Sequence, residues 1–209
     1  AELGSSGKLS DSLKWKLGAR LDYDFVYGIN DHYPADVERN QRHNIELREN
    51  YLDYSAGNWD LRLGKQHVVW GEMVGLFFAD VVSARDLREF ILPEFDQMRI
   101  TQWAARAEYF VDDFHAELLW IPVASYDNIG KPGAEFYPYQ PTFGFANVIY
   151  RGEKRPVRNA DNMNYGLRLS TLKNGWDISG FYYRSTDISP TFYRNVIDPT
   201  PITGTIEYQ

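Results

Sequence analysis

Apolar and polar residues alternate strictly along the first long segment of the chain. From Leu13 to Tyr27 every odd position is apolar or aromatic, and the even positions from Lys14 to Asp24 are charged or glycine. A period of two is typical of a β-strand with one apolar face, and helical periodicity does not produce it. At about 3.3 Å per residue the segment would extend about 50 Å, which suits a tilted strand that projects past a bilayer.

Six more segments show strand-like alternation, and short turn-forming sequences join them in pairs. The turns lie at 55–58, 111–113 and 173–175, and they contain the glycine, asparagine and aspartate residues that tight turns favour. The fifth strand stops at Pro122, which cannot donate to a central ladder. The predicted strands after the first cover residues 45–54, 59–70, 99–109, 114–120, 164–172 and 176–184.

The remaining connections are long. They cover residues 28–43, 71–98, 122–163 and 185–203, so short and long connections alternate along the chain. Outer-membrane barrels have this asymmetry, with the short turns on the periplasmic side. We therefore predict an all-β fold, an antiparallel up-and-down transmembrane β-barrel of the bacterial outer membrane, with a periplasmic N-terminus.

Aromatic residues gather near both ends of the predicted strands, as in the two girdles of a membrane barrel. The alternative is a soluble antiparallel sandwich, in which aromatic residues occupy the buried face. The loop asymmetry and the length of the first strand favour the barrel. The aromatics near the short turns are Trp15, Trp59, Tyr109, Phe114 and Trp176, and those near the long loops are Phe25, Tyr27, Trp103, Trp120, Tyr165 and Tyr182.

The final residues, 203–209, resemble the beginning of an eighth strand that is too short to span a bilayer. Bacterial single-chain barrels have even strand numbers, and an open sheet edge cannot face lipid. We expect residues 1–209 to be one barrel domain that is incomplete at its C-terminal end, the N-terminal portion of about seven to eight strands.

The alternation breaks at two charged positions. Lys65 falls on the apolar face of the third strand, and Glu49 on that of the second. A β-bulge near Gly64 would restore the pattern, because one extra residue reverses the face. We expect Glu49 and Lys65 to lie opposite each other, turn inward and form a structural ion pair. In the alternative they lie above the hydrocarbon and pair loosely in water.

Composition narrows the class further. No apolar stretch approaches the ~18 residues that a membrane-spanning helix needs. The aromatic share of 16% is high for a soluble domain, although carbohydrate-binding domains are also rich in aromatics. The absence of cysteine excludes disulfides and thiolate metal sites. A net charge of -7 without a basic run argues against a nucleic-acid partner.

Three short motifs resemble a known family. They are Arg48-Glu49-Asn50-Tyr51, Leu61 to Gln66, and Trp70-Gly71-Glu72, followed by Asp86-Leu87-Arg88. This arrangement is similar to that in a porin-like family of unknown function among Gram-negative outer-membrane β-barrels. Ser83-Ala84-Arg85 stands where that family is expected to have a proline. The resemblance implies a barrel longer than this chain and no established substrate, although such families are generally suspected of transporting hydrophobic or aromatic compounds.

Charged residues occupy the predicted inward face in both signs. In a barrel they would line the interior and set the selectivity of a water-filled pore. Alternatively, they neutralise one another in a packed plug that conducts nothing. The predicted pore-lining residues are Lys14, Lys16, Arg20, Asp22, Asp24, Glu46, Arg62, Arg106, Glu108, Glu117, Arg168 and Asp177.

The connection 71–98 is predicted to contain a short helix. Ser83 and Asp86 have the spacing of a capping box, and Leu87, Phe90 and Ile91 would form its apolar face before Pro93. The loop could fold inward as a constriction or form a lid on the surface. The apolar Leu76, Phe77 and Phe78 favour the constriction, because these side chains need a buried site. The constriction would present Arg85, Asp86, Arg88 and Glu89.

The connection 122–163 combines rigid prolines with many aromatic residues, which would stack on a sugar or aromatic solute or pack the loop on itself. Its basic tip, Gly152-Glu153-Lys154-Arg155, is a candidate contact for lipopolysaccharide phosphates. The residues in question are Tyr137, Tyr139, Phe143, Phe145 and Tyr150 with Pro132, Pro138 and Pro141.

Enzymatic signals are weak. The four histidines lack metal-binding spacing, and no serine lies in a Gly-x-Ser-x-Gly motif. We therefore expect no catalytic residue, cofactor or metal. The predicted function is passage of a small solute, hydrophobic or aromatic, by a barrel whose partners are outer-membrane lipid and lipopolysaccharide. A non-conducting structural or partner-binding barrel and a soluble carbohydrate-binding β-domain are the alternatives.

Overall fold

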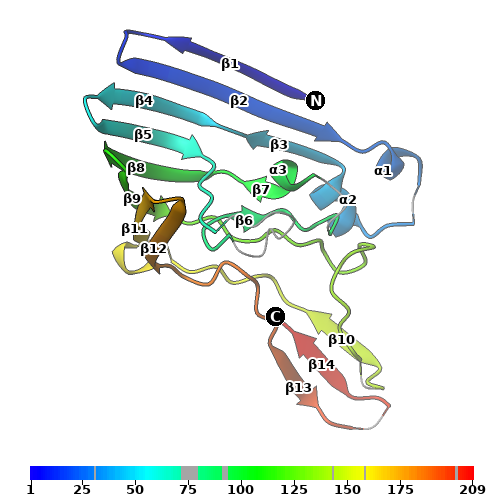
Figure 1. The fold of residues 1–209 in the computed structure, drawn as a ribbon. Helices are drawn as coiled ribbons and strands as arrows, with labels where there is room; N and C mark the ends of the chain where they lie inside the picture. Colours follow the sequence, from blue (N-terminus) through cyan, green and yellow to red (C-terminus); the bar gives the residue numbers. More distant parts are fainter. Residues whose placement is uncertain (31, 72–79, 91–93, 143, 158, 201) are drawn as a thin grey trace.

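The fold is all-β, and its largest part is one antiparallel sheet. The computed structural model describes residues 1–209 except 31, 72–79, 91–93, 143, 158 and 201. Within that part, nine strands form the main sheet in the order β1-β2-β4-β5-β8-β9-β11-β12, and β3 pairs with β2 beside β4 (Figure 1). Their bounds are β1 Glu2–Lys8, β2 Leu13–Tyr23, β3 His43–Leu47, β4 Asn50–Ala56, β5 Trp59–Gln66, β8 Gln102–Val111, β9 Phe114–Val123, β11 Asn164–Lys173 and β12 Trp176–Arg184.

Smaller elements occupy the long connections. β6 (Ala84–Arg85) pairs with β7 (Arg99–Ile100), and β10 (Asn147–Tyr150), β14 (Thr205–Tyr208) and β13 (Arg194–Asp198) form a separate three-stranded sheet. The short helices are α1 Val26–Ile29, α2 Ala35–Gln41, α3 Phe95–Met98 and the 3₁₀ helix η2 Ala160–Asn162. A membrane-spanning helix is absent from the described residues.

The predicted alternation of short and long connections is confirmed. Short turns join β1 to β2, β4 to β5, β8 to β9 and β11 to β12, and they lie together at one end of the sheet (Figure 1). The connections that follow β2, β5 and β9 begin at the other end. Positive φ at Gly57, Asp112, Asn174 and Gly175 allows the tight reversals.

The first predicted strand begins at Leu13 as expected, but it ends earlier than predicted and has a neighbour that was not predicted. β1 precedes it, and all of β1 pairs with residues 14–20 of β2, so the Ala1 amino group donates to Leu21 O at 2.6 Å. The N-terminus therefore lies beside the far half of β2 and not at the short-turn end. β2 itself stops at Tyr23, because Asp24 caps the turn into α1 by accepting a hydrogen bond from Val26 N at 2.9 Å.

The segment 203–209 is not the start of an eighth strand of the main sheet. β14 pairs in parallel with β10, from Asn147 opposite Thr205 to Tyr150 opposite Tyr208, and antiparallel with β13. Ile206 and Tyr208 are buried in this small sheet. Residues 205–208 do form a strand, but it pairs with β10 and β13 and not with the main sheet.

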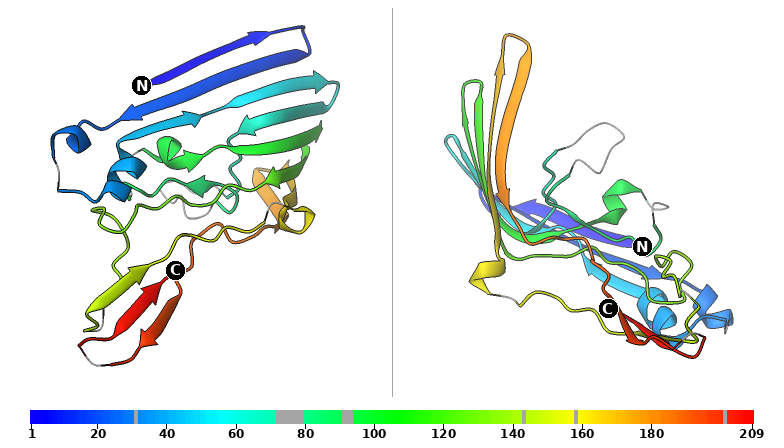
Figure 2. Two further views of the ribbon diagram at one scale, coloured as in Figure 1. Left: turned by 180° about the vertical axis from the view of Figure 1, so that it is seen from behind. Right: turned by 90° about the horizontal axis from the view of Figure 1, so that it is seen from below.

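The two faces of the main sheet differ in polarity. Leu61 and Leu63 on β5 point outward and are 37% and 57% exposed, whereas Asp60 and Arg62 between them are partly buried on the inner face. The sheet is strongly curved, and the connections from β5 to β8 lie on its concave side (Figure 2). The convex, outward face carries Leu17, Leu52, Tyr54, Trp59, Leu61, Leu63, Trp103, Leu118, Trp120, Tyr165, Leu167, Leu169, Ile178 and Tyr182, all exposed.

The break in alternation arises from a bulge, but in the strand before the predicted one. β2 pairs with β3 up to Leu47 and with β4 from Tyr51, opposite Ala19 and Lys16. Three residues, 48–50, therefore face the two residues 17–18, which is the extra residue of a β-bulge. β5 pairs without a register shift from Trp59 to Gln66. The bulge therefore lies at residues 48–50, and its predicted position near Gly64 is wrong.

Gly64 has a different role. Its φ of +134° is open only to glycine, and a Cβ at this position would lie 2.3 Å from Asn50 O. Strand β5 can therefore approach the bulged strand closely only with glycine here. The family-like Leu61 to Gln66 motif contains this glycine because the backbone requires it.

Replacement of Gly64 by alanine is expected to destabilise the protein by about 2 to 3 kcal/mol, through backbone strain and displacement of Asn50. Gly180→Ala is the matched control, because a Cβ there would have nothing within 4 Å. Urea unfolding measures both. Equal midpoints for the two variants would contradict this account.

The buried core lies between the sheet and the chain that follows β5. We call the described residues 67–71, 80–90 and 94–101 the inner segment. Val68, Trp70 and Val82 from this segment pack against Ala104, Leu119 and Ile121 on the concave face. The long-loop half of the concave face is therefore covered by the chain itself.

Candidate functional site

The concave face of the sheet carries a ladder of ion pairs toward the short turns. Arg62 donates to Asp53 across the β4–β5 pair at 2.8 Å. Arg106 lies 2.8 Å from Glu108 and 4.0 Å from Glu117. Strand pairing holds these side chains on one face, because directly opposite residues point the same way. The structure thus brings together six predicted pore-lining residues: Lys16, Arg62, Arg106, Glu108, Glu117 and Arg168, the last opposite Glu117 on β11.

Glu49 forms its ion pair with Lys16 and not with Lys65. In the bulge, Arg48 and Glu49 both turn to the concave face, where Arg48 lies 3.5 Å from Glu46 and Glu49 meets Lys16. Lys65 is instead opposite Asn50 and Trp103. Glu49 turns inward as expected. Because of the bulge, its partner is Lys16 on β2 and not Lys65 on β5.

The inner segment replaces the predicted constriction helix. Ser83 caps no helix: its hydroxyl donates to Val68 O at 2.8 Å, and Ala84 and Arg85 are in β6. Ile91 and the apolar Leu76, Phe77 and Phe78 lie outside the described residues. Asp80 Oδ1 accepts hydrogen bonds from the backbone N–H groups of Trp70, Val82 and Ser83. These bonds bend the chain at Asp80 and hold the residues before β6 in a non-helical conformation.

The four predicted constriction residues nevertheless lie together on this segment. Arg85 is paired with Asp127 at 2.8 Å. Arg88 is paired with Asp86 at 2.6 Å and donates to Asn40 O at 2.6 Å. Burial disfavours the charged form of Arg88, but its hydrogen bonds to Asp86 outweigh this and raise the pKa of the guanidinium. These pairs tie the inner segment to the connections on either side.

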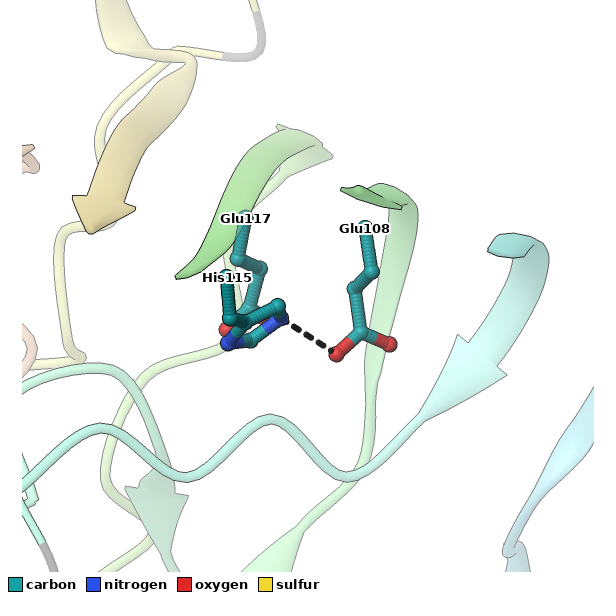
Figure 3. A group of neighbouring side chains, drawn as sticks. All are labelled: Glu108, His115 and Glu117. Carbon is teal, nitrogen blue, oxygen red and sulfur yellow. Dashed lines mark hydrogen bonds and ion pairs between the residues drawn. The ribbon is translucent and has the colours of Figure 1, made fainter. Parts of the chain in front are cut away.

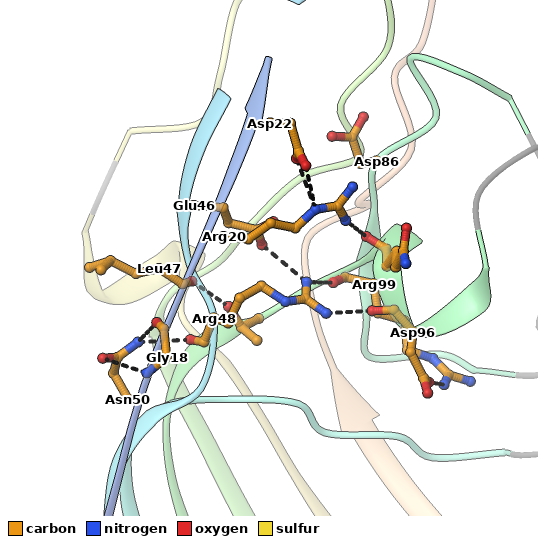
Figure 4. Close-up of polar contacts among 12 residues, drawn as sticks. Gly18, Arg20, Asp22, Glu46, Leu47, Arg48, Asn50, Asp86, Asp96 and Arg99 are labelled. Atoms are coloured by element: carbon orange, nitrogen blue, oxygen red, sulfur yellow. Dashed lines mark hydrogen bonds and ion pairs between the residues drawn. The ribbon is translucent and has the colours of Figure 1, made fainter. Parts of the chain in front are cut away.

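Arg48 joins the bulge to the inner segment, a role that the sequence did not predict. Its guanidinium donates to Arg99 O at 3.0 Å and to Asp96 O at 2.5 Å (Figure 4). Its side chain is only 7% exposed. Thr101 completes the attachment by donating to Leu47 O at 3.0 Å. The only sequence signal was the position of Arg48 within the family-like motif.

A cavity of about 460 Å³ lies between β2, β3, α2 and the inner segment. Arg20 lines it and pairs with Asp22 at 2.8 Å (Figure 4). Arg20 also donates to Gln97 O at 3.3 Å. The lining of the cavity includes five carboxylates against the guanidinium groups of Arg20 and Arg88. These carboxylates belong to Asp22, Asp24, Glu46, Asp86 and Glu89, all of them predicted as pore-lining or constriction residues.

Two predicted pore-lining residues lie apart from these groups. Lys14 is exposed beside the first short turn, opposite Lys8 and Asp53. Asp177 is exposed beside the last one, opposite Leu172. Both mark the short-turn rim of the sheet and not its centre.

The aromatic connection forms a second cavity, of about 740 Å³, against the small sheet. Tyr137 and Tyr150 meet there edge to face with ring centres 6.2 Å apart, and burial raises the pKa of the Tyr137 phenol. Gly152, Glu153 and Lys154 of the predicted basic tip line its edge. Tyr139 is exposed, and Phe143 lies outside the described residues.

One cluster could hold a metal ion among the described residues. It comprises Glu108, near the end of β8, and His115 and Glu117, near the start of β9 (Figure 3). Sequence spacing did not reveal it, because two of the three residues face each other across a turn.

Comparison with known proteins yields one match. Searches against curated proteins and against solved structures give no match. A family model described as "Protein of unknown function (DUF1302)" matches residues 5–209, which is nearly the whole chain. The expected resemblance to a family of unknown function is thereby confirmed, and the chain belongs to the DUF1302 family.

Proposed function

We propose that this protein is a porin-like channel of the bacterial outer membrane, in which the curved sheet is part of a closed barrel that passes a small solute. The observation that carries the proposal is the apolar convex face. It runs across the main sheet from Leu17 on β2 to Ile178 on β12, and its side chains are exposed. A contiguous apolar surface of this extent is unfavourable in water, so we expect lipid or a partner to cover it.

The dimensions of this face also suit a bilayer. Trp59 and Tyr109 are paired near the short turns with ring centres 4.8 Å apart, and Trp103 marks the other end of β8. Tyr109 and Trp103 are six positions apart, about 20 Å along the strand. An outer-membrane barrel has an apolar band of about 25 Å between its aromatic girdles. These aromatics therefore fit the expected girdles.

In this proposal β1 and β12 are not free edges. An unpaired strand edge in lipid would leave backbone groups without hydrogen bonds, so each must pair within the barrel. The short turns then face the periplasm, and Ala1, beside Leu21 at the other end of β2, lies on the opposite side from the periplasmic one expected. The small sheet and the cavity of about 740 Å³ lie on the outer surface, where lipopolysaccharide is the partner.

The cavity of about 460 Å³ supplies the selectivity in this proposal. A solute that enters from the long-loop side meets its five carboxylates, and their excess over arginine favours cations in a water-filled passage. Tyr23, Phe25 and Met98 add apolar surface to the same lining. A small organic solute with a positive charge matches this combination.

A non-conducting barrel is the second candidate, because the inner segment covers part of the concave face. Conductance of the purified full-length protein in a planar bilayer decides between the two. Discrete channels support the channel, and a correctly inserted protein without current rejects it. Heat-modifiable migration on gels tests the barrel itself, and a protein that is soluble without detergent and not heat-modifiable would reject both candidates.

Charge changes in the cavity test the selectivity. Glu89→Lys is expected to reduce the permeability ratio of K⁺ to Cl⁻ several-fold, because it reverses one of the five carboxylates. Asp113→Lys makes the same change of charge in the exposed β8–β9 turn and serves as the control. Reversal potentials in a KCl gradient measure the ratio. Equal shifts for both variants would mean that the cavity does not control permeation.

A further inference from the structure

The β8–β9 hairpin holds a compact group of metal-ligand side chains that the channel proposal does not use. Glu108 lies directly opposite Glu117, and His115 is two positions before Glu117 on the same face. One potential ligand atom from each lies within 4.8 Å of the others (Figure 3). We propose that Glu108, His115 and Glu117 bind a divalent transition-metal cation of the zinc type on the concave face, near the short turns.

The spacing already resembles that of bound ligands. His115 Nε2 lies 3.2 Å from Glu108 Oε1. Two ligands about 2.1 Å from a tetrahedral zinc ion are separated by about 3.4 Å. Only Glu117 has to approach, by little more than about 1 Å, and rotation of its side chain provides such a movement.

Glu117 supplies independent evidence for a missing ligand. Its side chain is 5% exposed, yet among the described residues its Oε1 has only weak contacts, with the bordering Trp70 indole and with Arg106 Nε at 4.0 Å, and no hydrogen bond of good geometry. A buried carboxylate oxygen without a good hydrogen bond is unfavourable. A cation bound between Glu117 and His115 would satisfy it.

The surroundings of His115 orient its ring for this role. Phe110 stacks on the imidazole with ring centres 4.5 Å apart and an angle of 9°. Ser170 Oγ lies 3.4 Å from Nδ1. When Nε2 binds a metal, the proton of the neutral ring is on Nδ1 and donates to the serine hydroxyl, as metal-bound histidines commonly donate to an outer partner.

The types of ligand atom select the class of ion. One imidazole and two carboxylates suit zinc and its neighbours, which accept nitrogen and oxygen ligands together, better than calcium, which prefers oxygen alone. Arg106 engages Glu108 through Oε2 at 2.8 Å and leaves Oε1 for the ion. The side chains of His115 and Glu108 are 24% and 18% exposed, so an ion can reach them from the concave side.

Calorimetric titration of the full-length protein in detergent with Zn²⁺, after treatment with a chelator, tests the proposal. We expect one site, weakened more than ten-fold in His115→Ala and Glu117→Gln, and by about ten-fold in Ser170→Ala. His43→Ala removes an exposed strand histidine outside the cluster and should leave the affinity unchanged. No binding, or binding that persists in His115→Ala and Glu117→Gln, overturns the proposal.

A measurement without substitutions guards against variants that fail to fold. Diethylpyrocarbonate modifies accessible histidines, and mass spectrometry reports each one separately. Zn²⁺ should protect His115 and leave His43 reactive. Equal modification of His115 with and without Zn²⁺ overturns the proposal. Neither experiment depends on ion conduction, so the metal site and the channel succeed or fail separately.

Discussion

Replacement of Trp70 by alanine is expected to destabilise the protein by about 3 to 5 kcal/mol and to release the inner segment. Trp70 is 1% exposed and is the largest side chain of the core between that segment and the sheet. Its ring covers Gly166, where a Cβ would lie 2.7 Å from Cζ3, and it meets Tyr183 with ring centres 5.7 Å apart. Alanine would leave a cavity that the rigid sheet cannot close.

Two measurements check this expectation. The urea midpoint should fall by about 1 M or more, given m-values of about 1 to 3 kcal/mol/M. In the proposed channel, single-channel conductance should rise, because the segment no longer covers the concave face. Trp103→Ala is the matched control, since Trp103 is 50% exposed on the convex face. A larger loss for Trp103 than for Trp70 would contradict the assigned core.

Replacement of Arg48 is expected to have the second largest effect, about 3 kcal/mol for Arg48→Met. Methionine retains the unbranched part of the side chain but lacks the guanidinium group, so it removes the hydrogen bonds to Asp96 O and Arg99 O and leaves Glu46 without its ion partner. The attachment of the inner segment to the bulge would then be lost, while the apolar core around Trp70 remains.

Arg48→Lys separates charge from geometry. Lysine retains the ion pair with Glu46 but lacks the planar fork that reaches two carbonyl groups at once, so an intermediate loss is expected. Arg39→Ala removes an exposed ion pair with Asp36 and should change stability by less than about 1 kcal/mol. Unfolding by urea, with proteolysis of residues 80–101 as a local probe, measures the series. If Arg48→Met retained full stability, Arg48 would not be what holds the inner segment to the bulge.

The Trp70 and Arg48 variants also bear on the two candidate functions. If the inner segment is a movable constriction, both variants should open the proposed passage, with Arg48→Met acting at a smaller loss of stability. If it is a permanent filling, both variants should lose stability without gaining conductance. The ion pairs of Arg85 and Arg88 hold the segment to neighbouring connections in either case.

The sequence by itself determined the all-β class, the short turns and the two faces of the sheet. These depend on interactions between residues close in the chain. Alternation from Leu13 to Tyr23 needs only the period of a strand, and the turn at Asn174-Gly175 needs only the local preference for positive φ. The same local rules placed Glu108, Glu117 and Arg106 on one face before any pairing was known.

Only the tertiary structure decided which of these residues meet. The pairing of Glu49 with Lys16, the clamp of Arg48 and the approach of His115 to Glu108 each depend on register between strands or on a bulge of a single residue. One residue of slip reverses a side chain from one face to the other, and sequence alternation cannot show which strand absorbs it. The long connections were harder still, because β10 and β14 pair across more than 50 residues by contacts that no local pattern encodes.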